Sequence, residues 1–138
     1  MSKFASVNQY GYYAKWFMLS KMGRKSPLVN TMLINYDCNL RCKHCSVHEN
    51  LEKLPGPRSM PYDTAVREME RKFQDGARII FFEGGEPTLW KDGDKDLGDL
   101  ISEGKRLGYF VTGYTTNGTN VMFEATAVIT DTLSGPKN

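Results

Sequence analysis

The sequence has few of the features that mark membrane, secreted or nucleic-acid-binding proteins. Its 138 residues include no apolar run long enough to cross a bilayer. The N-terminus lacks the charged, apolar and small-residue regions of a signal peptide. The formal net charge is only +2, which is too small to indicate a nucleic acid as partner. We therefore expect a cytoplasmic protein with a single hydrophobic core.

Cysteine is also scarce, and its placement is informative. The only three cysteines, Cys38, Cys42 and Cys45, lie in one short loop with the spacing C-x3-C-x2-C. An odd number of cysteines at metal-ligand spacing argues against a disulfide scaffold, and reduced thiols suit a reducing cytoplasm. A cubane iron–sulfur cluster usually takes four thiolates. Three thiolates would leave one iron free to bind a substrate or cofactor directly.

Four motifs along the chain resemble those of one known family. The cysteine loop is similar to the cluster loop of the radical SAM superfamily, C-x3-C-x-aromatic-C, with His44 at the aromatic position. Residues 84–87 read Gly-Gly-Glu-Pro after an apolar run and resemble the GGEP motif of that family. Residues 114–118 and 132–136 resemble the ends of its third and fourth strands. The resemblance spans residues 31–136, and the motifs occur in the family's order.

The resemblance implies a chemistry and a set of residues. Cys38, Cys42 and Cys45 would hold a [4Fe–4S] cluster, and S-adenosyl-L-methionine would bind its fourth iron. An electron from a reductant such as flavodoxin or ferredoxin would cleave that cofactor to a 5′-deoxyadenosyl radical, which abstracts hydrogen from an unknown small-molecule or peptide substrate. Glu86 is the expected catalytic residue, because its carboxylate can accept a hydrogen bond from the cofactor's ammonium group. The expected cofactor-binding residues are His44, Gly84, Gly85, Glu86, Pro87, Thr115, Asn117 and Thr132.

Other interpretations fit parts of the pattern. Zinc accepts a Cys3His ligand set, which His48 would complete, although zinc would not explain the Gly-Gly-Glu-Pro sequence. That tetrapeptide and the pair Asn117-Gly118 also occur in ordinary turns, and His44 is equally suited to the surface. A further alternative is a non-catalytic iron–sulfur module that completes its barrel with a partner chain.

Hydrophobic periodicity predicts an α/β fold. Apolar runs at 31–36, 78–83, 109–116 and 127–131 predict four strands, and helical patterns separate the first three. This order implies parallel strands with right-handed crossovers, whose chemistry gathers at the carboxyl ends of the strands. All four motifs fall at such ends. We therefore expect a partial, truncated parallel β/α barrel of the radical SAM type with about four strands.

The first 30 residues are expected to be an N-terminal amphipathic helical extension, and residues 31–138 the partial radical SAM core. The apolar face of the helix would contain Tyr10, Tyr13, Ala14, Phe17 and Met18. We expect this face to cover the bottom or edge of the sheet; the alternative is a helix whose aromatic residues enter lipid headgroups. The open sheet edge after the fourth strand predicts self-association.

Overall fold

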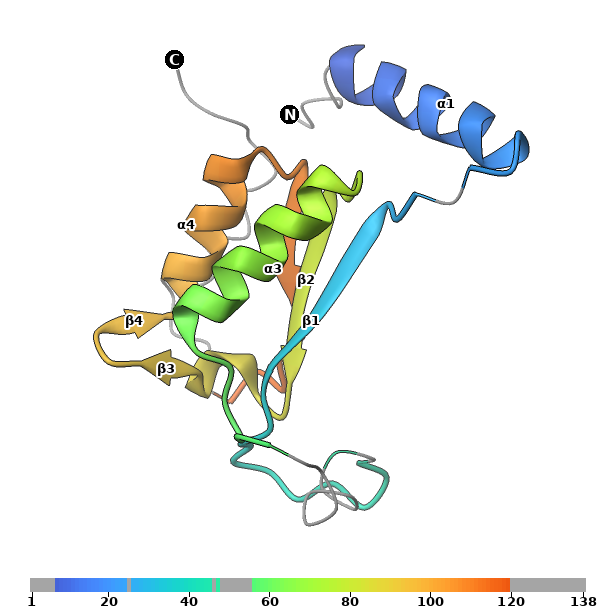
Figure 1. The fold of residues 1–138 in the computed structure, drawn as a ribbon. Coiled ribbons are helices and arrows are strands. Elements are labelled where there is room, and N and C mark those ends of the chain that lie inside the picture. The colour runs from blue at the N-terminus through green and yellow to red at the C-terminus, as the bar shows by residue number, and fades with distance from the viewer. Residues whose placement is uncertain (1–6, 25, 46, 48–55, 120–138) are drawn as a thin grey trace, which may run out of the picture.

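The computed structural model describes residues 7–24, 26–45, 47 and 56–119 (Figure 1). Three strands, β1 (Val29–Asn35), β2 (Ile79–Gly84) and β5 (Val111–Tyr114), form one sheet in the order β1-β2-β5. Both pairs are parallel, as the sequence predicts. The strand expected at 127–131 lies outside the described residues, as do Thr132 and His48.

Two helices cover one face of this sheet (Figure 1). Helix α3 (Tyr62–Gln74) connects β1 to β2, and α4 (Leu97–Leu107) connects β2 to β5. Residues alternate in burial along β1, where Met32 and Ile34 are buried and Leu33 is 43% exposed. This alternation shows that the described helices cover the Met32 side of the sheet and leave the Leu33 side open.

The predicted helix boundaries are explained by capping groups. Helix α4 begins with a reciprocal capping box, in which Asp96 accepts from Asp99 N and Asp99 accepts from Asp96 N. The helix ends at Gly108, whose φ of 97° is the left-handed conformation that favours glycine. Helix α3 follows Pro61 and is succeeded by Gly76, also at positive φ.

A small substructure that the sequence did not predict lies between β2 and α4. It contains a 3-10 turn, η2 (Pro87–Leu89), and a hairpin of β3 (Lys91–Asp92) and β4 (Lys95–Asp96). Trp90 joins η2 to the hairpin; its side chain is fully buried and its Nε1 donates to Met60 O at 2.9 Å. Asp92 Oδ2 accepts from Tyr62 N at 2.8 Å, at the start of α3. These contacts fix the segment that follows the Gly-Gly-Glu-Pro sequence.

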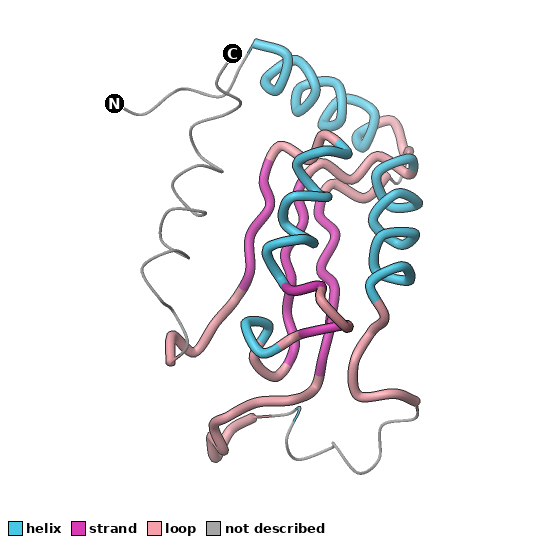
Figure 2. Tube along the Cα trace, turned by 90° about the vertical axis from the view of Figure 1, so that its left-hand side faces the viewer, coloured by secondary structure: helices cyan, strands magenta, loops and turns pink. Residues whose placement is uncertain are grey.

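Helix α1 (Val7–Lys21) lies at the amino ends of the strands, opposite the cysteine loop (Figures 1 and 2). The predicted apolar face is largely exposed: Tyr10, Phe17 and Met18 are 54–63% accessible. The helix packs through Tyr12, which donates to Gly76 O, and through Trp16 Nε1, which donates to Ser26 O at 2.9 Å. Tyr13 is the residue of the predicted face that joins this contact, with its ring centroid 5.8 Å from that of Phe110.

The physical reason is that aromatic residues occur all round this helix. Tyr12 and Trp16 carry donors that satisfy backbone carbonyls at the sheet's end, whereas Phe17 carries none. None of the helix residues is fully buried. Within the described residues, no helix has the length and apolarity needed to cross a membrane.

Candidate functional site

The three cysteines lie on the loop that follows the carboxyl end of β1. Cys38 and Cys42 are exposed, Cys45 is half-buried, and none is in a disulfide. A turn brings Cys45 N within 3.2 Å of Cys42 O. The loop therefore presents reduced thiols at the sheet edge where the sequence predicts the chemistry.

Hydrogen bonds fasten the start of this loop to the turn after β2. Gly85 N donates to Asn35 O at 2.9 Å, and Glu86 N donates to Asp37 O at 2.8 Å. The buried Asn35 side chain adds a third link, since its Nδ2 donates to Glu86 O at 3.1 Å. These hydrogen bonds hold Asn35 and Asp37 against the Gly-Gly-Glu-Pro turn, and Cys38 is the next residue in the chain.

The two glycines of this turn are required by the close approach of the loop. A Cβ on Gly84 would lie 2.3 Å from Asn35 O, and a Cβ on Gly85 would lie 2.4 Å from Asp37 O. Both distances are far inside the ~3.5 Å at which heavy atoms make favourable contact. The glycines therefore allow the cysteine loop to pack against the end of β2. Their approach to a cofactor stays a prediction.

Glu86 joins the carboxyl ends of β2 and β5. Its side chain is fully buried. Oε1 accepts from Thr88 N at 3.1 Å, Thr88 Oγ1 at 2.7 Å and Thr116 Oγ1 at 2.8 Å, and Oε2 accepts from Asn117 N at 2.7 Å. Burial alone would raise the pKa of this carboxyl, but these hydrogen bonds outweigh burial and lower the pKa below its ordinary value.

The carboxylate consequently has partners that the sequence did not reveal. Four donors from Thr88, Thr116 and Asn117 occupy it, and it has no surface in contact with solvent. These contacts hold the ends of two strands in register. The contact between Glu86 and the ammonium group of a cofactor stays a prediction.

Asn117 brings the end of β5 to the cysteine loop. Its Nδ2 lies 3.6 Å from Cys38 Sγ and 2.9 Å from Asn39 Oδ1. The structure thus gathers three of the motifs at one edge of the sheet, as their positions after strands predict. It also adds Asn35 and Asn39, which sequence reasoning missed. The signal for Asn35 was a polar residue at the end of an apolar strand.

The other expected site residues have less defined surroundings. His44 and Thr115 are exposed, and Pro87 is buried at the first position of η2. Thr115 N donates to Phe82 O at 3.1 Å, which extends the pairing of β2 and β5 by one residue. None of these three contacts a cysteine sulfur among the hydrogen bonds between described residues, so their cofactor-binding roles stay predictions.

Comparison with protein families decides the identity of the fold. The model of the radical SAM superfamily matches residues 32–132. The chain belongs to the radical SAM superfamily. Proteins of this superfamily carry [4Fe–4S] clusters and use S-adenosylmethionine. The resemblance found in the motifs is thereby confirmed, and the parallel sheet with its helices is part of a radical SAM barrel.

Several curated proteins resemble part of this radical SAM chain. "Molybdenum cofactor biosynthesis protein 1" of Dictyostelium discoideum is 37% identical over 82 residues, which are 59% of this chain and 12% of the relative. "GTP 3',8-cyclase" of Clostridium botulinum is 35% identical over 78 residues, 56% of this chain and 24% of the relative. The mitochondrial "GTP 3',8-cyclase" of Arabidopsis thaliana is 33% identical over 75 residues, 54% of this chain and 19% of the relative.

The matched segments cover 12% to 24% of the length of these relatives. No solved structure gives a significant match to the chain.

The thiols of this radical SAM chain suit a cluster by their chemistry. Soft thiolate ligands select iron–sulfur clusters and zinc. In the described part of the chain, no three His, Cys, Asp or Glu side chains converge closely enough to hold a single metal ion. The alternative Cys3His zinc site would also need His48, which lies outside the described residues.

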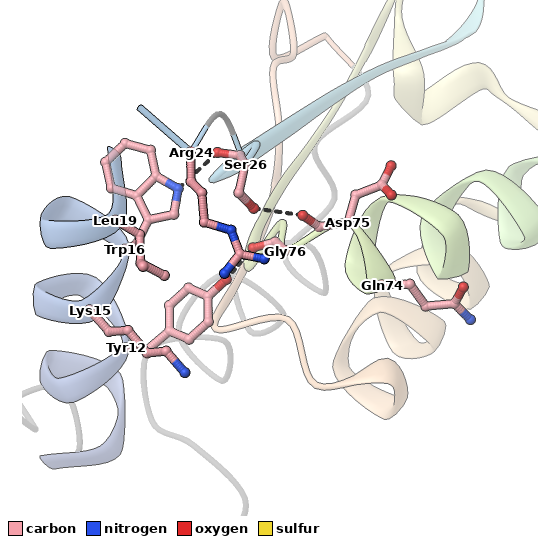
Figure 3. Close-up of a pocket in the computed structure, with 9 residues that line it drawn as sticks. All are labelled: Tyr12, Lys15, Trp16, Leu19, Arg24, Ser26, Gln74, Asp75 and Gly76. Atoms are coloured by element: carbon pink, nitrogen blue, oxygen red, sulfur yellow. Dashed lines mark hydrogen bonds between the residues drawn. The ribbon is translucent and has the colours of Figure 1, made fainter. Parts of the chain in front are cut away.

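A cavity of about 480 Å³ lies at the opposite end of the sheet (Figure 3). Two of its lining residues, Lys15 and Arg24, are cationic, but Asp75 and the C-terminus of α3 contribute opposite charge. No motif residue lines it. We therefore place the candidate site at the carboxyl ends of the strands. The cavity at the opposite end is lined by Tyr12, Lys15, Trp16, Leu19, Arg24, Ser26, Gln74, Asp75 and Gly76.

Proposed function

We propose that this chain forms the cluster-binding part of a radical SAM enzyme, in which Cys38, Cys42 and Cys45 hold a [4Fe–4S] cluster. The observation that carries the proposal is the attachment of a three-thiol loop to the Gly-Gly-Glu-Pro turn by the two backbone hydrogen bonds from Gly85 and Glu86. The sequence contains no fourth cysteine, which leaves one iron for S-adenosylmethionine. When bound, these cofactors would supply a 5′-deoxyadenosyl radical that abstracts hydrogen from the substrate.

The chain's own residues would hold and orient these groups. The cysteine thiolates would bind three irons, and Asn35 would keep their loop against the end of β2. Glu86 would fix the ends of β2 and β5, so that Thr115 and Asn117 face the same edge. In this arrangement the glycines, Pro87 and His44 would border the cofactor. Each residue contributes position, while the chemistry resides in the cofactors.

Reductive cleavage of S-adenosylmethionine is the direct test of this function. The chain would be reconstituted anaerobically with iron and sulfide, reduced with dithionite, and assayed for 5′-deoxyadenosine. We expect cluster absorption and a product that depends on both reductant and cofactor. A cluster without product would favour the non-catalytic module that needs a partner chain. Stoichiometric zinc without cluster absorption would favour the Cys3His site.

The cysteine ligands are tested by single substitutions. Replacement of Cys38, Cys42 or Cys45 by Ala should abolish stable cluster binding, because two thiolates cannot hold the cluster as three do. Iron and sulfide content per chain is the measurement. Leu40→Ala is a matched control in the same loop, since Leu40 is 39% exposed and has no ligand chemistry. Normal iron content in a cysteine variant would contradict the assignment.

The finer functional assignments follow from the relatives and the family. GTP is the first substrate to test, because two of the relatives named above are GTP cyclases. We expect GTP to increase 5′-deoxyadenosine formation if this chain, or a longer protein that contains it, shares that substrate. Flavodoxin or ferredoxin would be the reductant. A peptide or another small molecule becomes the candidate if GTP has no effect on the rate.

A further inference from the structure

We propose that Asn117 is a positioning residue that sets the reduction potential of the cluster through a hydrogen bond to Cys38. The inference rests on the proposed function, because it takes Cys38 as a cluster ligand. Asn117 Nδ2 donates to Cys38 Sγ at 3.6 Å, although the two residues are 79 positions apart. The bond joins the end of β5 to the first thiol of the loop after β1.

The orientation of the Asn117 amide is determined by its other partners. Its Oδ1 accepts from Thr119 N at 3.0 Å and from Thr119 Oγ1 at 2.7 Å. Its Nδ2 donates to Asn39 Oδ1 at 2.9 Å. Because the oxygen faces two donors, the NH2 group must face Asn39 and Cys38. The donor is therefore aimed at the sulfur before any cofactor binds.

The backbone of Asn117 is held independently of this side chain. Its N–H donates to Glu86 Oε2 at 2.7 Å, and Glu86 is fully buried. A substitution that changes only the side chain leaves this anchor in place. The loss of the N–H···S bond can therefore be separated from the loss of the strand-end structure.

Asn117 differs from the other donor to Cys38. Leu40 N also donates to Cys38 Sγ, at 3.4 Å, but it is a backbone group within the loop. Among hydrogen bonds between described residues, Asn117 supplies the one side-chain donor to a cysteine sulfur. A substitution at Asn117 can therefore remove a hydrogen bond to this sulfur, whereas a substitution at Leu40 leaves its backbone N–H in place.

The expected effect follows from the charge of the cluster. Reduction adds one negative charge, part of which resides on the ligand sulfurs, so an N–H donor stabilises the reduced state more than the oxidised state. Hydrogen bonds to the sulfurs are among the factors that set cluster potentials. The neutral amide of Asn117 therefore raises the potential, and its removal should make reduction harder.

The test compares two neutral variants of the full chain after anaerobic reconstitution. Asn117→Ala removes the donor to Cys38, whereas Asn39→Ala removes the other partner of the same amide and no sulfur contact. The midpoint potential would be measured by redox titration monitored by EPR. For Asn117→Ala we expect about a tenfold lower equilibrium constant for one-electron reduction, which is a shift of about 59 mV to more negative potential. Asn39→Ala should retain the wild-type potential.

Equal potentials in wild type and Asn117→Ala, or an equal shift in Asn39→Ala, would overturn the inference while leaving the proposed function intact. Absence of a cluster from the wild-type chain would overturn both. If Asn117→Ala does not bind a cluster, Asn117→Leu and Asn39→Leu decide. Both changes are neutral and keep a side chain of similar size, but only Asn117→Leu loses the donor to Cys38. The inference requires the lower potential in Asn117→Leu, and equal potentials overturn it.

Discussion

At the scale of single residues, the environment of Glu86 explains why a carboxylate can be buried beside the cysteine loop. Four hydrogen bonds from Thr88, Thr116 and Asn117 compensate its desolvation. The side chain therefore stabilises the fold in its charged form. This structural contribution is present whether or not Glu86 also contacts a cofactor, and it can be measured by itself.

Glu86→Gln should lower the free energy of unfolding by about 1–3 kcal/mol at neutral pH. Both oxygens of the Glu86 carboxylate accept hydrogen bonds, so the NH2 group of the glutamine would face an N–H or O–H donor. The pKa of Glu86 is lowered in the folded state, so its contribution is present above the unfolded pKa of about 4.3. This contribution is lost as the pH falls through the folded pKa. The difference between wild type and variant should therefore shrink on acidification. Urea denaturation at a series of pH values measures it.

A matched control is available in β2, three residues before Glu86. Glu83 is only half-buried in β2, so Glu83→Gln should change stability by no more than about 0.5 kcal/mol. A Glu86→Gln protein as stable as wild type at neutral pH would show that the buried charge is not stabilising.

At the scale of elements, the loop after β1 and the turn after β2 behave as one unit. They are joined by the two backbone hydrogen bonds from Gly85 and Glu86 and by the Asn35 side chain. The absence of side chains at Gly84 and Gly85 makes this contact possible. The position of the first cysteine thus depends on residues about 50 positions later in the chain.

Gly85→Ala should disturb the cysteine loop while leaving the sheet folded. Its Cβ would lie 2.4 Å from the backbone oxygen of Asp37, so the loop must move away from β2. We expect a lower iron content after reconstitution, with far-ultraviolet circular dichroism close to wild type. Gly11→Ala in α1 is the control, because nothing lies within 4 Å of its Cβ. Full iron content in Gly85→Ala would show that the loop tolerates displacement.

At the scale of the whole molecule, the described sheet has two different faces. Helices α3 and α4 cover one, while the other exposes Val29, Leu33 and Phe81 to 36–46%. Parallel sheets are almost always covered on both faces. The described strands also leave β1 and β5 as edges. Both features suit part of a barrel whose inner face needs further structure.

We predict that the chain self-associates through this open sheet. Light scattering over a range of concentrations should show a rising average mass, because the exposed apolar face and free edges favour pairing. Leu33→Lys should reduce the association. Val7→Lys should have little effect, since Val7 is 86% exposed on α1, away from the sheet. A monomer at high concentration would rule the prediction out.

The sequence by itself determined the family, the parallel α/β class and the location of the motifs after strands. The C-x3-C-x2-C spacing and the Gly-Gly-Glu-Pro sequence are local patterns, and strand alternation and helix stops such as Gly108 are also local. Such patterns can be recognised in a single sequence because they depend only on residues that are close together along the chain.

Only the tertiary structure decided which side chains meet. The contacts of Glu86 with Thr116, of Asn117 with Cys38, and of Asn35 with the turn join segments from different strands. The same holds for α1, where Tyr12 and Trp16 pack because their donors reach carbonyls at Gly76 and Ser26. Such pairings depend on how strands and helices are placed in space. Periodicity along the chain predicts the type of each element and its buried face, but not which residues of other elements it meets.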